Sequence, residues 1–251
     1  MMFYHSRAAG LPARVCQLFA AAALALSTAC AALPTEPDDD GGAAAEVHYN
    51  RLGGSDAIAL GASVPCLPFV DCPSGTGYVQ VLERRLSEGG RTVNLRNLGI
   101  PGAVLSPRIQ TLSRSYGPRV DFNFLERELP FVDRDSTVVT IFAGGNDTNV
   151  VARSVSGQSD GDPRAYVDAQ VALFASEMRT LVQGIRDRAP DARIVIANLP
   201  NFAGTPFTKS YSMTERRVLQ QISVGFSTEA INPLAAMSNV PVVDLLCEAV
   251  E

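Results

Sequence analysis

Histidine is scarce in this chain of 251 residues, as are the patterns typical of nucleotide and metal binding. The two histidines are His5 and His48. No G-x-G-x-x-G or Walker sequence follows an expected strand, and no cluster of metal-ligating residues occurs, so we expect no cofactor and no metal. The basic residues form no run or stripe and the net charge is −5, which excludes an obvious nucleic-acid site.

The apolar run over residues 15–26 is too short for a membrane-spanning helix of about 20 residues. Two arginines precede it and small residues follow, so residues 1–30 are predicted to be a signal peptide. Its last four residues resemble a lipobox that would place a lipid on Cys30, although Ser27 stands where an aliphatic residue is usual. An ordinary cleavage site at Ala29–Ala31 is the alternative.

We favour the lipoprotein slightly, and expect a periplasmic or extracellular protein with membrane attachment through Cys30. Residues 31–45 are rich in Pro, Asp, Gly and Ala, and should be a flexible linker. Residues 46–251 are long enough for one α/β domain, which we expect to be monomeric.

Cysteine usage fits export. Cys66 and Cys72 lie six residues apart, and in an oxidising compartment we expect them to form a disulfide. Cys247 is left over. A buried thiol is the commoner interpretation, and a partner beyond the given sequence is the alternative.

Short β-rich runs alternate with helical patterns after residue 46. The expected strands cover residues 47–52, 92–98, 137–142, 193–199 and 240–245. The expected helices cover residues 78–86, 163–188, part of 104–116 and most of 213–235. This alternation predicts a parallel sheet between two layers of helices. Pocket walls should come from loops at 62–77, 103–120, 148–161 and 200–212, where Phe202, Phe207 and Tyr211 either line an acyl pocket or simply pack together.

Three strand ends carry residues suited to acyl transfer. Gly53–Asp56 supplies a serine, Asn97–Gly102 a glycine turn, and Gly144–Asp147 an asparagine. A hydroxyl nucleophile with backbone and side-chain N–H donors is what acyl transfer needs. Each pattern alone is common in turns, but the three together after successive strands favour a site at the carboxyl edge of the sheet.

These three segments resemble, in order, blocks I, II and III of the SGNH (GDSL-type) hydrolase superfamily. The resemblance implies Ser55 as nucleophile, Gly102 as backbone oxyanion donor and Asn146 as side-chain donor. Block I departs from the usual G-D-S-L, because Gly54 replaces the aspartate. The resemblance spans residues 47–245, and implies a flavodoxin-like α/β/α sandwich that hydrolyses esters through an acyl-enzyme.

The family's last block, Asp-x-x-His, is missing. We therefore expect a domain incomplete at its C-terminus, one sheet face partly bare, and impaired catalysis. His48 cannot replace the missing base, since seven extended residues place it roughly 23 Å from Ser55. The alternatives are a non-catalytic protein of this fold that binds an acylated glycan or lipid, and an unrelated flavodoxin-like protein.

Overall fold

The computed structural model describes residues 46–66, 72–117 and 119–248, and contains a five-stranded sheet with the order β2-β1-β3-β4-β5. All neighbouring strands are parallel. The strands are β1 (Val47–Gly53), β2 (Val93–Asn97), β3 (Val138–Phe142), β4 (Arg193–Ala197) and β5 (Val242–Val243). This order is the flavodoxin-like one, and the expected α/β fold is confirmed. The predicted signal peptide, Cys30 and the linker lie outside the described residues.

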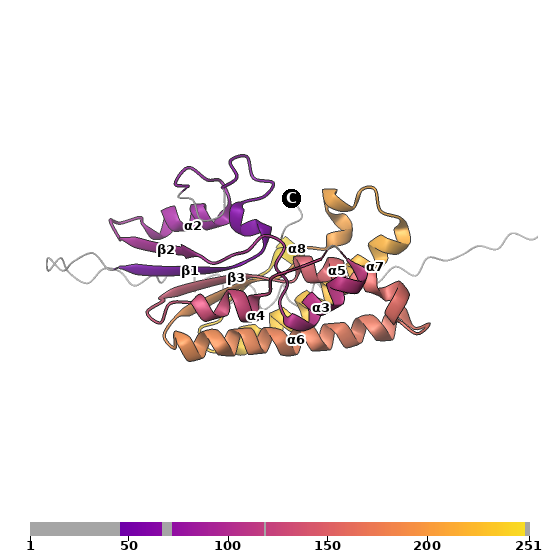
Figure 1. Ribbon diagram of the computed structural model, residues 1–251. Coiled ribbons are helices and arrows are strands. Elements are labelled where there is room, and N and C mark those ends of the chain that lie inside the picture. Colours follow the sequence, from indigo (N-terminus) through magenta and orange to yellow (C-terminus); the bar gives the residue numbers. More distant parts are fainter. Residues whose placement is uncertain (1–45, 67–71, 118, 249–251) are drawn as a thin grey trace, which may run out of the picture. The chain divides into compact units, whose positions relative to one another are not determined.

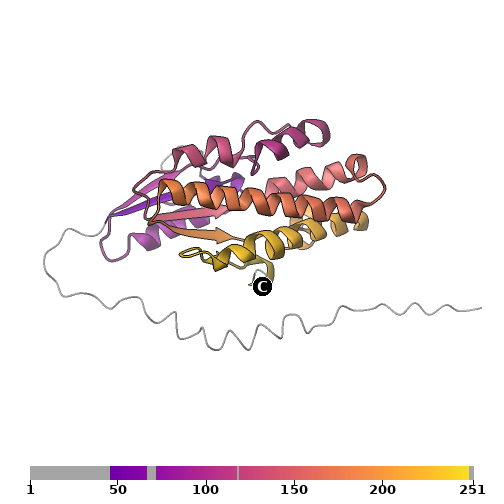
Figure 2. The same ribbon diagram turned by 90° about the horizontal axis from the view of Figure 1, so that it is seen from below.

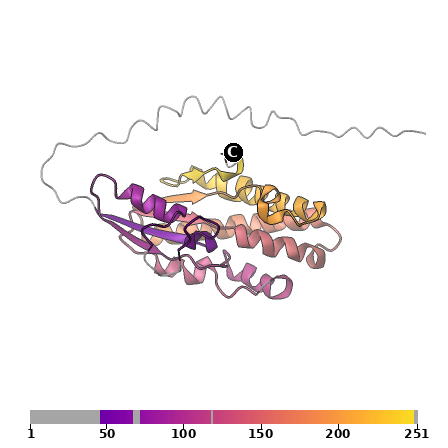
Figure 3. The ribbon, with the colours of Figure 1, turned by 90° about the horizontal axis from the view of Figure 1, so that it is seen from above.

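Helices cover the sheet on both sides, as Figure 1 shows, with α2 on one side and α3, α4 and α6 on the other. Seen from below, α6 lies over the sheet and runs along the strands (Figure 2); seen from above, α2 lies over β1 and β2 (Figure 3). The helices are α2 (Tyr78–Leu86), α3 (Pro107–Tyr116), α4 (Phe124–Arg127), α5 (Gly145–Gln158), α6 (Pro163–Arg188), α7 (Met213–Gly225) and α8 (Leu245–Glu248). A π-helical turn at Phe226–Ile231 and a 3-10 turn at Asn232–Ala236 continue α7. No helix within the described ranges has the length and apolarity to cross a bilayer.

The longest helix, α6, has the bounds that the sequence predicts. The Asp162 side chain accepts a hydrogen bond from the Ala165 amide, and Pro163 occupies the first turn. Its apolar positions recur with the helical period and are buried against the sheet. One of them, Phe174, stacks on Phe226 with the ring centroids 3.9 Å apart.

The expected loop at 148–161 is wrong, because α5 occupies Gly145–Gln158. Its sequence is rich in Asn, Ser and β-branched residues, which have poor intrinsic helix propensity. Val150, Val151 and Val155 are buried among α3, α6 and α7, so packing stabilises this helix. The side of the molecule that carries Asn146 is therefore built on a helix.

The last strand is shorter than expected. β5 has two residues in place of the predicted 240–245. Asp244 ends it by accepting hydrogen bonds from the Leu246 and Cys247 amides, at 3.0 and 3.2 Å, and so starts α8. Cys247 is exposed, which corrects the expectation of a buried thiol. Val243, in this edge strand, is 44% exposed.

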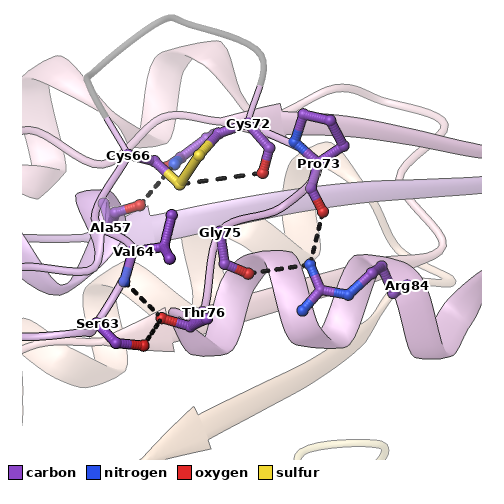
Figure 4. Close-up of a disulfide and its surroundings, with 10 residues drawn as sticks. Ala57, Ser63, Val64, Cys66, Cys72, Pro73, Gly75, Thr76 and Arg84 are labelled. Atoms are coloured by element: carbon purple, nitrogen blue, oxygen red, sulfur yellow. Dashed lines mark hydrogen bonds between the residues drawn. A yellow bond between two sulfur atoms is a disulfide. The ribbon is translucent and has the colours of Figure 1, made fainter.

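A disulfide joins Cys66 to Cys72, with the Cα atoms 5.8 Å apart, and this confirms the expected pairing. It lies beside α2 (Figure 4), where Arg84 donates hydrogen bonds to the carbonyls of Pro73 and Gly75 at 2.8 and 2.9 Å. A Cβ atom on Gly75 would collide with the Cys66 sulfur, so glycine is needed there. The bridge thus ties Cys66 to the segment that leads into α2.

Candidate active site

The candidate site lies at the carboxyl ends of β1 and β3, where the strand order reverses. Ser55 follows β1 and Asn146 follows β3, and the two strands are adjacent. Both residues line one cavity of about 330 Å³. Its other walls are Gly54, Asp56, Leu60, Ala103, Phe124, Phe142, Gly144, Gly145, Asn149, Phe202 and Phe207. Phe202 and Phe207 therefore line the cavity, whereas Tyr211 lies beyond it.

Ser55 begins a single 3-10 turn, Ser55–Ile58, and is half-buried. The Gly54 amide donates to the Asp56 carboxylate at 3.0 Å, which closes the turn around the serine. A Cβ atom on Gly54 would lie 2.9 Å from the Asn146 amide nitrogen. In this chain Gly54 therefore leaves room for Asn146 to approach the serine turn.

Asn146 belongs to the first turn of α5. Gly144 precedes the helix with a φ of 107°, a left-handed conformation that favours glycine. The Asn146 amide nitrogen donates to the Ala103 carbonyl at 2.8 Å. The next residue, Asp147, accepts a hydrogen bond from the Leu105 amide at 2.9 Å. The start of α5 is thus tied to the segment that follows β2.

Asp147 is a buried carboxyl group with one oxygen that has no hydrogen-bond partner among the described residues. Burial raises its pKa to about 7, although the hydrogen bond from the Leu105 amide lowers it. The group therefore holds a proton to much higher pH than an exposed aspartate.

Gly102 occupies a turn next to the cavity. The Ala103 amide donates to the Ile100 carbonyl at 3.0 Å, Pro101 is the second residue of the turn, and Gly102 has a φ of 83°. This is the pattern of a type II turn, which needs glycine at the third position. Gly102 is exposed, and its neighbour Ala103 supplies the cavity wall. The structure thus places Ser55 and Asn146 in one cavity. Gly102 does not line this cavity, but the next residue in the chain does.

A buried charge lies behind the serine turn. The guanidinium of Arg51 is fully buried and forms an ion pair with Asp56, and its Nε donates to the Tyr78 hydroxyl at 2.8 Å. Cβ atoms on Gly53 or Gly99 would collide with this guanidinium. The two glycines at the ends of β1 and β2 therefore provide the space that Arg51 fills.

Glu128 bridges the same two strand ends. Its carboxylate accepts hydrogen bonds from the Gly53 amide at 2.8 Å and the Ile100 amide at 3.4 Å. Burial raises the pKa of Glu128 to about 8, while the Gly53 amide and the charge of Arg51 oppose the shift. Glu128 and Arg51 thus fix the loops that carry the serine and the glycine turn.

Sequence reasoning missed these two charged residues as parts of the site. Arg51 gave a signal, because a charged residue is unusual in a strand of a parallel sheet that helices cover on both faces. Glu128 gave none, since it lies in an irregular stretch between α4 and a short 3-10 turn.

His48 lies at the opposite end of β1. Its imidazole nitrogens face Asp135 at 3.2 Å and Glu46 at 3.5 Å. Seven residues of extended chain, roughly 23 Å, separate it from Ser55, so it cannot take the serine proton. His5 is outside the described residues, and the described part of the chain contains no group of three or more side chains that could hold a metal ion.

Comparisons with known proteins identify the family of the chain. Residues 56–250 match the GDSL-like lipase/acylhydrolase family, and the matched segment starts one residue after Ser55. Comparison with curated proteins gave no match. The structure is similar to an extracellular lipase from Streptomyces rimosus, at 20% identity over 80% of each chain with a TM-score of 0.50. It is also similar to the lipase Lip_vut3 from a goat rumen metagenome, at 17% identity over 80% of this chain and 81% of the other, with a TM-score of 0.54.

These structural similarities, at such low identity, bear on the fold alone. The family match covers most of the chain and includes the segments that carry Gly102 and Asn146. The chain belongs to the GDSL-like lipase/acylhydrolase family, as its resemblance to the SGNH hydrolases predicted.

Proposed function

We propose that this protein hydrolyses an ester through an acyl-enzyme on Ser55. The observation that carries the proposal is the shared cavity, which Ser55 and Asn146 both line from the ends of adjacent strands. The family is one of ester hydrolases in general, and the substrate is a small ester or an acylated glycan or lipid.

In the proposed reaction the Ser55 oxygen attacks the ester carbonyl carbon and loses its proton to a base. The Asn146 side-chain amide and the Ser55 backbone amide bind the carbonyl oxygen as it becomes negative. Gly102, in the turn beside the cavity, is the proposed third donor. Collapse of this adduct breaks the ester bond, and the alcohol leaves with a proton. Water then attacks the acyl-Ser55 ester, releases the acid and restores the hydroxyl.

The reaction needs a base near Ser55, and the described residues place no histidine there. His48 is at the wrong end of β1, and no other histidine occurs among the described residues. We infer that proton transfer limits turnover by the chain as its sequence stands. The oxyanion donors and substrate binding alone retain roughly 10³–10⁴-fold acceleration over water in serine hydrolases that lack a triad member.

Added imidazole tests this proposal directly. Imidazole fits a cavity of this size, and should raise p-nitrophenyl acetate hydrolysis by the unmodified chain in a saturable way. Ser55→Ala should lose this increase, whereas Ser63→Ala, which removes an exposed hydroxyl outside the cavity, should keep it. An equal increase in Ser55→Ala and the unmodified protein would rule Ser55 out as nucleophile.

The second candidate is a binding protein for an acylated glycan or lipid that it does not cleave. The absence of a histidine beside Ser55 in the described part of the chain favours it. Saturable binding of such a ligand, with no Ser55-dependent turnover even in imidazole, would support this candidate over hydrolysis.

We also propose that the protein works outside the cytoplasm, attached to a membrane through Cys30. The disulfide between Cys66 and Cys72 supports export, because such bridges persist in oxidising compartments. Mass spectrometry of the protein from the membrane fraction tests this proposal. An N-terminal peptide that starts at a lipid-modified Cys30 is expected, and an unmodified start at Ala32 would identify a secreted protein instead.

A further inference from the structure

A second cavity of about 510 Å³ lies between α5 and α7. On the α5 side it is lined by Asn149, Ala152, Arg153, Val155 and Ser156, and on the other side by Tyr211, Thr214, Glu215, Val218 and Leu219. We call it the α5–α7 groove.

The α5–α7 groove lies next to the cavity that Ser55 and Asn146 line, which we call the catalytic cavity. Asn149 lines both of them. On the opposite side, the ring of Phe207, which lines the catalytic cavity, packs against the ring of Tyr211, which lines the groove, with the centroids 5.6 Å apart. The groove and the cavity that holds Ser55 are therefore neighbours, separated by no more than these side chains.

The inner surface of the groove is apolar. Val155 and Leu219 are buried, and Ala152 and Val218 are half-buried beside them. The charged groups lie at the exposed rim, and Glu215 is already bound to the Ser212 amide and hydroxyl. No buried side-chain atom lining the groove lacks a hydrogen-bond partner among the described residues. Such an inner surface stabilises a hydrocarbon chain, and the polar residues of the lining surround it.

The direction of the groove matches that of a chain bound at the ester carbonyl. Asn146, which would bind the carbonyl oxygen, is at the start of α5, and Ser156 lies ten residues further along the same helix. At ~1.5 Å per residue, the groove reaches roughly 15 Å from the oxyanion donor. A straight chain of medium length would follow the helix over this distance.

We propose that the α5–α7 groove binds the hydrocarbon chain of a medium-chain ester whose carbonyl sits at Ser55. The proposal rests on the proposed function for the position of the carbonyl. The chain can belong to the acid or to the alcohol of the ester, and both have the same chemistry in the groove.

Binding to the Ser55→Ala protein tests the groove without requiring turnover. In calorimetric titrations, p-nitrophenyl decanoate should bind at least tenfold more tightly than p-nitrophenyl acetate, because several methylene groups become buried. Decyl acetate in the same assay identifies the source of the chain. A preference for decyl acetate alone would assign the groove to the alcohol, and a preference for the decanoate alone would assign it to the acid.

Val218→Trp should fill the groove and weaken binding of p-nitrophenyl decanoate at least tenfold, while p-nitrophenyl acetate binds as before. Leu173→Trp is the matched control, since it enlarges an exposed leucine on α6 outside both cavities. Equal affinity for long and short esters, or equal loss of both in Val218→Trp, would overturn the proposal. Chain-selective binding without Ser55-dependent hydrolysis in imidazole would leave the groove standing and contradict only the proposed function.

Discussion

The guanidinium of Arg51 is completely buried and forms an ion pair with the carboxylate of Asp56, the residue after Ser55. Asp56 is itself mostly buried, with a side-chain exposure of 26%. A positive charge inside the protein thus holds the turn that presents the serine.

Arg51→Met should destabilise the protein by about 3–5 kcal/mol, because it leaves the Asp56 carboxylate without its partner. Urea unfolding measures this change. Arg85→Met is the matched control, since Arg85 and Glu88 form an ion pair with both side chains exposed, where removal costs about 0–1 kcal/mol. If both variants unfold at the same urea concentration, the buried pair has no special role in stability.

Stability should fall as the pH rises from about 4 to 8. Burial raises the pKa of Glu128 from 4.5 to about 8 and that of Asp147 from 3.8 to about 7. Between the ordinary and the raised values, the folded protein holds protons that the unfolded chain has released. The free energy of unfolding contributed by both groups is therefore fully present below pH 4 and lost by pH 8.

Urea unfolding at pH 5 and pH 8 tests this dependence. Glu128→Gln and Asp147→Asn remove one titrating group each, so each should reduce the difference between the two pH values, and the double variant should reduce it further. A double variant with the same pH dependence as the unmodified protein would show that other groups cause it.

Asn146→Ala should lower kcat for imidazole-assisted ester hydrolysis by about 10²–10³, with little change in KM, because the amide acts on the charge that develops during attack. Steady-state kinetics with p-nitrophenyl acetate measure the effect. Asn94→Ala, at an exposed position on β2, should leave both constants unchanged. A variant at position 146 that raises KM and keeps kcat would assign the amide to substrate binding.

Loss of the disulfide should lower the free energy of unfolding by about 2 kcal/mol, because a bridge that closes so short a loop removes little entropy from the unfolded chain. The double variant Cys66→Ser/Cys72→Ser should therefore unfold at lower urea than the oxidised protein. The unmodified protein in excess reductant serves as the control and should match the double variant. Identical unfolding of the oxidised protein and the double variant would contradict the prediction.

The sequence was most informative where local patterns and tertiary packing agree. The period of apolar residues in 163–188 and the cap at Asp162 predict α6 correctly, and the β-rich run at 137–142 predicts β3 to within one residue. Ser55 and Asn146 were predicted to lie together, because parallel strands place their carboxyl ends at the same edge, and the structure brings them into one cavity.

The rest depends on contacts between distant residues. α5 forms because α3, α6 and α7 pack around it, which local propensity does not reveal. Glu128 accepts a hydrogen bond from the amide of Gly53, which lies 75 residues earlier in the chain, and no local pattern marks this glutamate. The groove along α5 was missed for the same reason, since its position follows from a helix that was expected to be a loop.

Positions 51, 53 and 99 form a set that can change only in a particular order. The arginine occupies the volume where side chains at the two glycines would otherwise lie. Alanine at Gly53 or Gly99 should therefore be rejected while Arg51 is present, and accepted more readily once that side chain is shortened. Single replacements at any of these three positions should therefore destabilise the protein, whereas a combined replacement of Arg51 and one of the glycines can be tolerated.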